Sequence, residues 1–434
     1  MEMITNQGTA SLSAPRKWFI GWPMVALGWI GVFCCGTITY AGSYINSMMV
    51  LDTGMSQTVV GYCGSLISLF TVLFSTMLGS LMVKYSHRTL MLIGLVLALA
   101  GFCGLAFLPT SPVQYVLMYI PLGLSVTLLN KIGGPSLANT WFNHRKSIPV
   151  ALMIAAGSFG GIFAGPIRSL MNSTGTWRTG WMFMIGFAVL SIVCMFFVRD
   201  DVHKMGEIRD GKYWCEKHGY PTVEPDIDRK KVKVTGNPFK YLKNGRFFFL
   251  SFSCFIRMAI YATGASYITL TVIERGLTPE AAALTVVNFS LASTIGRIAG
   301  GFYSYLHISN TMANRIAFFM CGVGGIMLCT VNNVSALSVA VILIGAGYGV
   351  GYTSQTMVIS DFYPKGEYAT LFGAFSSLVN VASVVMGTVS AWIGAILGVY
   401  SPIYLVLGIA CIAFGILFGL ARPKTDDVFA VKKD

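Results

Sequence analysis

The sequence predicts an all-α protein that crosses a membrane about twelve times, in two halves of six helices each. Hydrophobic residues make up 55% of its 434 residues and charged residues only 11%, whereas a soluble domain carries about 25% charged residues. The apolar residues form long runs, each close to the roughly 20 residues that a membrane-spanning helix needs. One long polar stretch, at 199–246, divides these runs into two equal sets.

The predicted spans follow the apolar runs from one end of the chain to the other. We place them at residues 19–46, 57–83, 89–109, 112–140, 148–170, 181–198, 247–272, 280–305, 314–331, 335–360, 370–394 and 400–421. The predicted domains are then an N-terminal six-helix half (1–198), a cytoplasmic central loop (199–246) and a C-terminal six-helix half (247–434). Repeated halves of this kind are an architecture of secondary transporters.

The distribution of basic residues predicts the orientation of the chain. If both termini are cytoplasmic, the outer loops hold only Arg168, Arg178 and Arg275, and the remaining loop lysines and arginines are inside, as the positive-inside rule requires. The net charge of +13 therefore needs no nucleic-acid partner. We expect a monomer in the lipid bilayer of a bacterial inner membrane. The mixed charges of 199–246 predict a solvated linker, with contact to lipid headgroups as the lesser alternative.

Several function classes find no support in the sequence. Nine of the ten cysteines lie in apolar runs, and none has zinc-ligand spacing beside histidines. A nucleotide-binding loop is absent. The spans contain no mid-span aspartate, glutamate or histidine from which a catalytic set is built. We therefore expect no enzyme activity, no cofactor and no metal, and a membrane enzyme or a receptor is only a minor alternative.

Three cations, Lys131, Arg257 and Arg297, lie inside apolar spans. A charged residue at the bilayer centre costs roughly 2.5–3.5 kcal/mol on insertion scales, so it usually has a function. Each lies eight to ten residues from the predicted inner end of its span, or roughly 12–15 Å at helical rise, which is near the middle of a hydrocarbon core of about 30 Å. No carboxylate is available at this depth, so an anionic substrate is the expected partner.

The chemistry of the three cations suits a carboxylate. A planar guanidinium grips a carboxylate through two parallel hydrogen bonds. Lysine readily loses its proton when buried, so Lys131 is expected to be neutral in an empty site and charged beside an anion. The competing interpretations are that Arg297 bonds to helix carbonyls, that Arg257 reaches toward the surface, and that Gly133-Gly134-Pro135 breaks the helix after Lys131.

Polar and aromatic residues recur on the faces of four spans. Small residues repeat as well: Gly157, Gly161 and Gly165 on the fifth span, and Gly345 and Gly349 on the tenth, predict close helix packing. The polar stripes are either helix contacts or the walls of a substrate cavity. As candidate substrate-binding residues beside the three cations, we take Tyr40, Tyr44, Tyr261, Tyr348, Tyr352, Gln355 and Asn380.

Three stretches resemble the major facilitator superfamily, and within it the monocarboxylate porters and oxalate:formate antiporters. They are Ala138-Asn139-Thr140-Trp141-Phe142 through Arg145 to Ala155–Gly160; Gly296-Arg297 followed by Gly300-Gly301; and Ser360-Asp361-Phe362 leading to Gly373-Ala374-Phe375. The resemblance implies the major facilitator fold and a substrate-binding arginine at Arg297. It does not extend to Lys131 or Arg257.

The chain departs from both subgroups at their other charged positions. Proton-coupled monocarboxylate porters have an aspartate where this chain has Ala292, and the oxalate exchangers have a lysine within 376–380, where this chain has none. An empty cationic carrier resists reorientation through a low dielectric, whereas an anion-loaded one does not. We therefore predict a secondary active transporter that exchanges small organic anions, carboxylates, by alternating access. The alternative is a proton-coupled monocarboxylate symporter.

Overall fold

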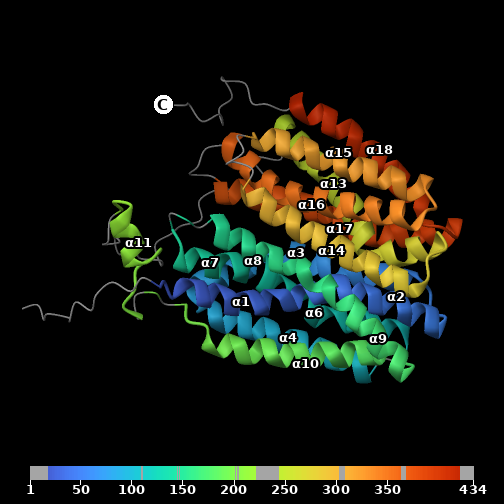
Figure 1. Ribbon diagram of the computed structural model, residues 1–434, viewed down its shortest axis with the longest axis horizontal. Helices are drawn as coiled ribbons and strands as arrows, with labels where there is room; N and C mark the ends of the chain where they lie inside the picture. The colour runs from blue at the N-terminus through green and yellow to red at the C-terminus, as the bar shows by residue number, and fades with distance from the viewer. Residues whose placement is uncertain are drawn as a thin grey trace, which may run out of the picture.

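The computed structural model describes residues 18–108, 111–143, 145, 147–200, 202, 205–220, 244–302, 308–362 and 368–420. All regular elements within these ranges are helices, and most run along the long axis of the molecule (Figure 1). The helices that precede residue 200 lie side by side in the lower part of the view, and those after residue 244 lie in the upper part. We call these two groups the N-terminal bundle and the C-terminal bundle.

The helices alternate in direction, so each bundle has a near end, on the side where α1 begins and α18 ends, and a far end. The N-terminal bundle contains α1 (Gly21–Gly36), α2 (Gly42–Thr53), α3 (Thr58–Lys84), α4 (His87–Phe107), α5 (Pro112–Leu117), α6 (Tyr119–Val126), α7 (Gly134–Trp141), α8 (Ser147–Phe159), α9 (Ala164–Thr174) and α10 (Arg178–Phe197). The C-terminal bundle contains α13 (Gly245–Glu274), α14 (Pro279–Phe302), α15 (Asn310–Thr330), α16 (Val334–Phe362), α17 (Tyr368–Leu397) and α18 (Ser401–Leu417).

The apolar lengths of these helices confirm an all-α polytopic membrane protein. Ten described helices are long and apolar enough to cross a membrane. Two shorter apolar segments, Thr58–Phe74 and Ser401–Leu417, lie where the second and twelfth spans are predicted. The total of twelve spans, and the division of the chain at residues 198 and 247, stay predictions.

Two helices differ from the expected pattern. The first predicted span continues past residue 46 to Thr53, interrupted by a π-helical stretch at Thr37–Ala41. The helix does not break at Gly133-Gly134-Pro135; instead a second π-helical stretch, Thr127–Gly133, leads into α7. Pro135 has no N–H to offer the carbonyl four residues earlier, which favours a local change of helix type.

The first part of the central loop is folded, so the prediction of a solvated linker is wrong there. A short helix, α11 (Lys212–Lys217), follows Asp210, whose side chain is fully buried. Asp210 accepts hydrogen bonds from the main-chain N–H groups of Asn143 and Arg145, and its carboxylate lies 3.6 Å from the Arg145 guanidinium. This segment is thereby attached to the α7–α8 turn. Burial lowers the pKa of Arg145, and Asp210 opposes that shift.

Glycines let several helices approach closely, as their spacing predicts. A Cβ on Gly160 would lie 2.0 Å from the Gly36 carbonyl carbon, and one on Gly349 would lie 2.3 Å from the Ser293 oxygen. Gly165 is an exception among the predicted packing glycines, because no atom lies within 4 Å of its Cβ position. The first contact joins α1 to the 3-10 turn Gly160–Phe163 that follows α8, and the second joins α14 to α16. These helices lie beside the cavity described below.

The two bundles are joined at the far end by hydrogen bonds between side chains of one and main-chain oxygens of the other. Ser43 donates to the Ser266 oxygen (3.1 Å), Tyr44 to the Pro279 oxygen (3.4 Å) and Ser65 to the Val384 oxygen (2.8 Å). The side chains of Arg168 and Glu280 form an exposed ion pair at this end. These contacts hold the bundles together at the far end of the molecule.

Candidate substrate cavity

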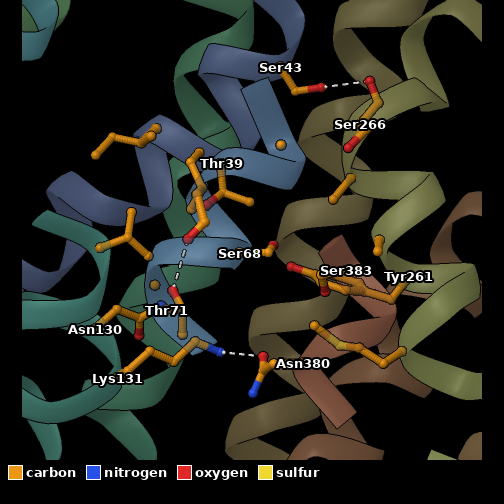
Figure 2. Close-up of a pocket in the computed structure, with 18 of the residues that line it drawn as sticks. Thr39, Ser43, Ser68, Thr71, Asn130, Lys131, Tyr261, Ser266, Asn380 and Ser383 are labelled. Carbon is orange, nitrogen blue, oxygen red and sulfur yellow. Dashed lines mark hydrogen bonds between the residues drawn. The ribbon is translucent and has the colours of Figure 1, made fainter. Parts of the chain in front are cut away.

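A cavity of about 110 Å³ lies between the two bundles. Its walls come from α2, α3, α6 and α8 on one side and from α13, α14, α16 and α17 on the other. The polar or charged residues that line it are Thr39, Ser43, Asn46, Ser68, Thr71, Tyr119, Asn130, Lys131, Tyr261, Ser266, Arg297, Tyr348, Asn380 and Ser383. Figure 2 shows Lys131 and Asn380 at one end and Ser43 and Ser266 at the other.

Lys131 is brought to the cavity by the π-helical stretch Thr127–Gly133. Its ammonium group donates to the Asn380 side-chain oxygen at 3.4 Å, across the boundary between the bundles. Asn380 is held with this oxygen outward because its amide nitrogen bonds to the main-chain oxygen of Ser376. Lys131 also lies over the ring of Tyr352, with the ammonium nitrogen 5.5 Å from the ring centroid. Neither of these partners is a carboxylate.

Arg297 lines the same cavity and is almost fully buried. Its guanidinium lies beside two tyrosine rings, 5.3 Å from the centroid of Tyr348 and 4.9 Å from that of Tyr352. One terminal nitrogen donates to the Ile154 oxygen at 2.7 Å, so the backbone contact expected of a packing arginine is present. The buried Nε has no partner among the described residues. An unsatisfied buried donor is costly, and an acceptor from a ligand would remove that cost.

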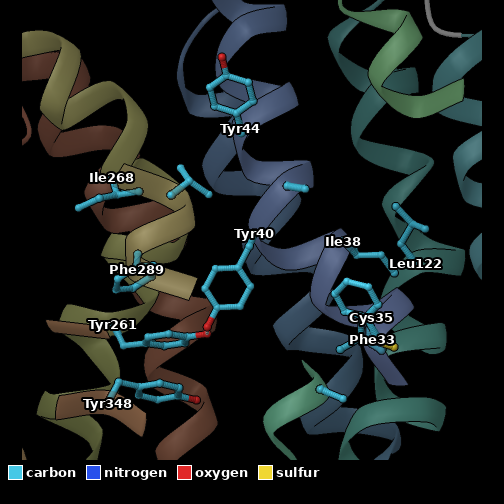
Figure 3. Packing of buried hydrophobic residues seen from close by; sticks show 14 of the residues in the cluster. Phe33, Cys35, Ile38, Tyr40, Tyr44, Leu122, Tyr261, Ile268, Phe289 and Tyr348 are labelled. Carbon is cyan, nitrogen blue, oxygen red and sulfur yellow. Dashed lines mark hydrogen bonds between the residues drawn. The ribbon is translucent and has the colours of Figure 1, made fainter. Parts of the chain in front are cut away.

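A tyrosine cluster forms the wall beside Arg297 (Figure 3). The rings of Tyr261 and Tyr348 stack with their centroids 3.3 Å apart. The Tyr40 hydroxyl is 2.8 Å from the Tyr261 hydroxyl and joins the N-terminal bundle to this stack. Tyr261 and Tyr348 line the cavity, whereas Tyr40 lies behind Tyr261. Tyr352 contacts both cavity cations, so four of the tyrosines predicted from sequence gather at this site.

Two predicted site residues lie elsewhere. Tyr44 is not part of the cavity wall and belongs to the far-end contacts, with its hydroxyl directed to the Pro279 oxygen. Gln355 is also absent from the wall, because its side-chain oxygen accepts a 2.6 Å hydrogen bond from Arg257. The expectation that these two residues line the same pocket as the cations does not match this geometry.

Arg257 is buried inside the C-terminal bundle and does not line the cavity. Its guanidinium donates to the Asn314 side-chain oxygen (2.5 Å), the Gly351 main-chain oxygen (2.9 Å) and Gln355. The ring of Phe318 covers it at 4.9 Å. A Cβ on Gly351 would lie 2.4 Å from the guanidinium carbon, so a larger residue there would displace the guanidinium. Arg257 therefore ties α13 to α15 and α16 and does not converge with the other two cations on the pocket.

Replacing Arg257 with lysine should weaken the fold more than it weakens ligand binding. An ammonium group is a single point of charge and fails to satisfy three oxygens that the planar guanidinium reaches together. We expect a loss of about 2–4 kcal/mol of stability, seen as a lower melting temperature of the purified protein. Carboxylate affinity at temperatures where the variant is folded should change less than threefold. A loss of carboxylate affinity without a loss of stability would show instead that Arg257 takes part in binding.

Several cavity residues were not predicted from the sequence. Asn46, Asn130, Ser68 and Ser383 all line the pocket. Asn130 precedes Lys131 on the π-helical stretch, and both residues line the cavity. In the sequence, these residues could have been recognised as cavity candidates because they are polar residues within apolar runs. No cluster of three or more histidine, cysteine, aspartate or glutamate residues suited to a metal was found in the part of the chain that is described.

The fold and the inter-bundle cavity define a multi-pass membrane transporter, and the comparison of sequences agrees. The sequence profile of the Major Facilitator Superfamily matches residues 28–386, with a second match over 308–433. The chain belongs to the Major Facilitator Superfamily. No significant match was found among curated proteins.

Proposed function

We propose that this transporter exchanges small organic anions, carboxylates, by alternating access at the cavity between the two bundles. The observation that carries the proposal is the placement of Lys131 and Arg297 on that cavity, both against the ring of Tyr352. No described carboxylate bonds to either cation. Two positive charges without a counter-ion, one buried and one half-buried, repel each other and attract an anion.

The shape of the site fits the two parts of a carboxylate. The guanidinium of Arg297 and the ammonium of Lys131 supply donors to the charged oxygens. The stacked rings of Tyr261 and Tyr348 supply an apolar wall for the carbon skeleton. This arrangement favours binding and release over chemistry, because the wall has no described carboxylate, histidine or cysteine to act as acid, base or nucleophile. The proposal accordingly includes no enzyme activity.

Exchange is the proposed mode of coupling, because the empty site carries positive charge that the bound anion neutralises. The two bundles would rock against each other around the site, with both termini on the cytoplasmic side of a bacterial inner membrane and the protein acting as a monomer. Proton-coupled monocarboxylate symport is the second candidate. The observation that favours it is that Lys131 bonds across the boundary between the bundles to Asn380 and lies over the Tyr352 ring, so a change at its ammonium group would act on both bundles.

Counterflow in proteoliposomes separates these two modes. Vesicles loaded with an unlabelled carboxylate at millimolar concentration and diluted into the same labelled acid, with equal pH on both sides, should take up label at least about tenfold faster than empty vesicles. Neutralisation of the site by the anion on the return step is the reason for this difference. Equal uptake by loaded and empty vesicles, together with strong stimulation by an inward proton gradient, would contradict exchange and support symport.

A further inference from the structure

The side chain of Asn46 holds a fixed orientation at the far end of the cavity. It lies on α2 and is buried, yet it is one of the cavity-lining residues. Its side-chain oxygen accepts hydrogen bonds from the hydroxyls of Tyr115 (2.6 Å) and Tyr119 (2.8 Å). A carbonyl oxygen has two lone pairs, so these two bonds use its full accepting capacity.

The direction of these bonds is set by Trp181. Its indole N–H donates to the Tyr115 hydroxyl oxygen at 3.1 Å, and an indole nitrogen can only donate. The Tyr115 hydroxyl is thereby left to donate, and it donates to the Asn46 oxygen. The Tyr119 hydroxyl, which also lies within hydrogen-bonding reach of Tyr115, donates to the same oxygen. The amide oxygen of Asn46 therefore faces the two tyrosines, and the NH₂ group faces the other way.

The NH₂ group of Asn46 has no hydrogen-bond partner among the described residues. It is also not among the fully enclosed side-chain atoms that lack a partner, so it is open to the cavity that Asn46 lines. An NH₂ group offers two donors. The far end of the cavity thus presents N–H donors without a formal charge.

The two ends of the cavity are well separated. Tyr119, which bonds to Asn46, and Lys131 lie twelve residues apart on one continuous helical run and both line the cavity. At 1.5 Å per residue their Cα atoms are about 18 Å apart along the axis. Figure 2 shows the same elongation, with Ser43, one helical turn from Asn46, at the opposite end from Lys131.

We propose that Asn46 is a specificity-determining residue that donates to an uncharged acceptor, such as a keto oxygen, on the end of the substrate remote from its carboxylate. This inference rests on the proposed carboxylate function and narrows it. The preferred substrates are acids with an acceptor beyond the carboxylate, and plain alkanoates of equal length bind more weakly. A site with buried donors discriminates against the analogue that lacks the acceptor, because the donors are then left unpaired.

The test measures binding of two matched pairs of acids to the purified full chain by isothermal titration. The pairs are 4-oxopentanoate with pentanoate, and 6-oxoheptanoate with heptanoate. In the wild-type protein the keto acid of at least one pair should bind about tenfold more tightly than its partner, which is the effect of one well-placed hydrogen bond to an otherwise unpaired buried donor.

Two variants assign the discrimination to Asn46. Asn46→Leu removes both N–H donors, and the affinity ratio should fall to about one, because the keto acid loses its hydrogen bond and the alkanoate no longer leaves buried donors unpaired. Asn46→Asp keeps an acceptor for Tyr115 and Tyr119, so it protects the fold if the leucine variant is unstable, and it should invert the preference because a carboxylate repels the keto oxygen. Ser68→Ala, elsewhere on the wall, is the control and should retain the wild-type ratio.

The possible failures are distinct. If carboxylates bind but the wild-type protein does not distinguish the members of either pair, or if the ratio survives in Asn46→Asp, the role of Asn46 is overturned and the proposed function stands. If no acid binds to the wild-type protein, the carboxylate function is overturned as well, and the inference falls with it.

Discussion

Replacing Arg297 with glutamine should abolish saturable carboxylate uptake and lower carboxylate affinity at least about 100-fold. The guanidinium is buried, and its Nε lacks a partner among the described residues, so the variant loses a charge-assisted hydrogen bond in a low dielectric, an effect of about 2–5 kcal/mol. Uptake into proteoliposomes and titration of the purified protein both measure it. Arg297→Lys should recover only part of the affinity, because lysine lacks the planar pair of donors.

The control for this experiment is Arg168→Gln. Arg168 is also an arginine, but it lies outside the cavity and is paired with Glu280 at the exposed far end. Exposed ion pairs contribute at most about 1 kcal/mol, so carboxylate affinity should stay within a few-fold of the wild-type value. Unchanged affinity in Arg297→Gln would exclude Arg297 as the group that recognises the anion.

Gly160→Val should prevent the protein from reaching its native packing. A Cβ at this position would lie 2.0 Å from the Gly36 carbonyl carbon and 2.1 Å from the Thr37 nitrogen, which are main-chain atoms that cannot rotate away. Overpacking of a side chain that can adjust costs about 1–3 kcal/mol, and this contact should exceed that range. We expect little monodisperse protein in size-exclusion chromatography and a melting temperature too low to measure.

Gly165→Val provides a matched comparison for this substitution. Gly165 follows in the next helix, α9, and no atom lies within 4 Å of its Cβ position. The same change should therefore leave the yield and the melting temperature close to those of the wild-type protein. If Gly160→Val folds as well as Gly165→Val, the close approach of α1 to the turn that follows α8 is not required for folding.

The fold was readily predicted from the sequence, because a bilayer selects long apolar helices. The predicted spans agree with the observed helices to within a few residues except at the first, where the helix continues to Thr53. Two polar residues, Ser43 and Asn46, lie near its predicted end. In the structure both lie within α2 and line the cavity, so their side chains find polar surroundings without leaving the helix.

The candidate site was only partly predictable, because helical rise gives the depth of a residue and not the direction in which it points. Lys131, Arg257 and Arg297 all have the right depth, but Arg257 turns into its own bundle and bonds to Asn314. Tyr44 was assigned to the face of Tyr40 by the period of an α-helix. Tyr40 lies within the π-helical stretch Thr37–Ala41, whose period differs from that of an α-helix, and Tyr44 in the following α2 reaches the far-end contacts instead.

Three of the hydrogen bonds that join the bundles at the far end depend on a side chain in only one of the two bundles. Ser43, Tyr44 and Ser65 donate from the N-terminal bundle, and the acceptors in the C-terminal bundle are main-chain oxygens. A main-chain oxygen persists through almost any substitution, whereas a hydroxyl is lost in most. Substitutions at positions 266, 279 and 384 would thus leave these three hydrogen bonds intact. Substitutions at positions 43, 44 and 65 that remove the hydroxyl would break them.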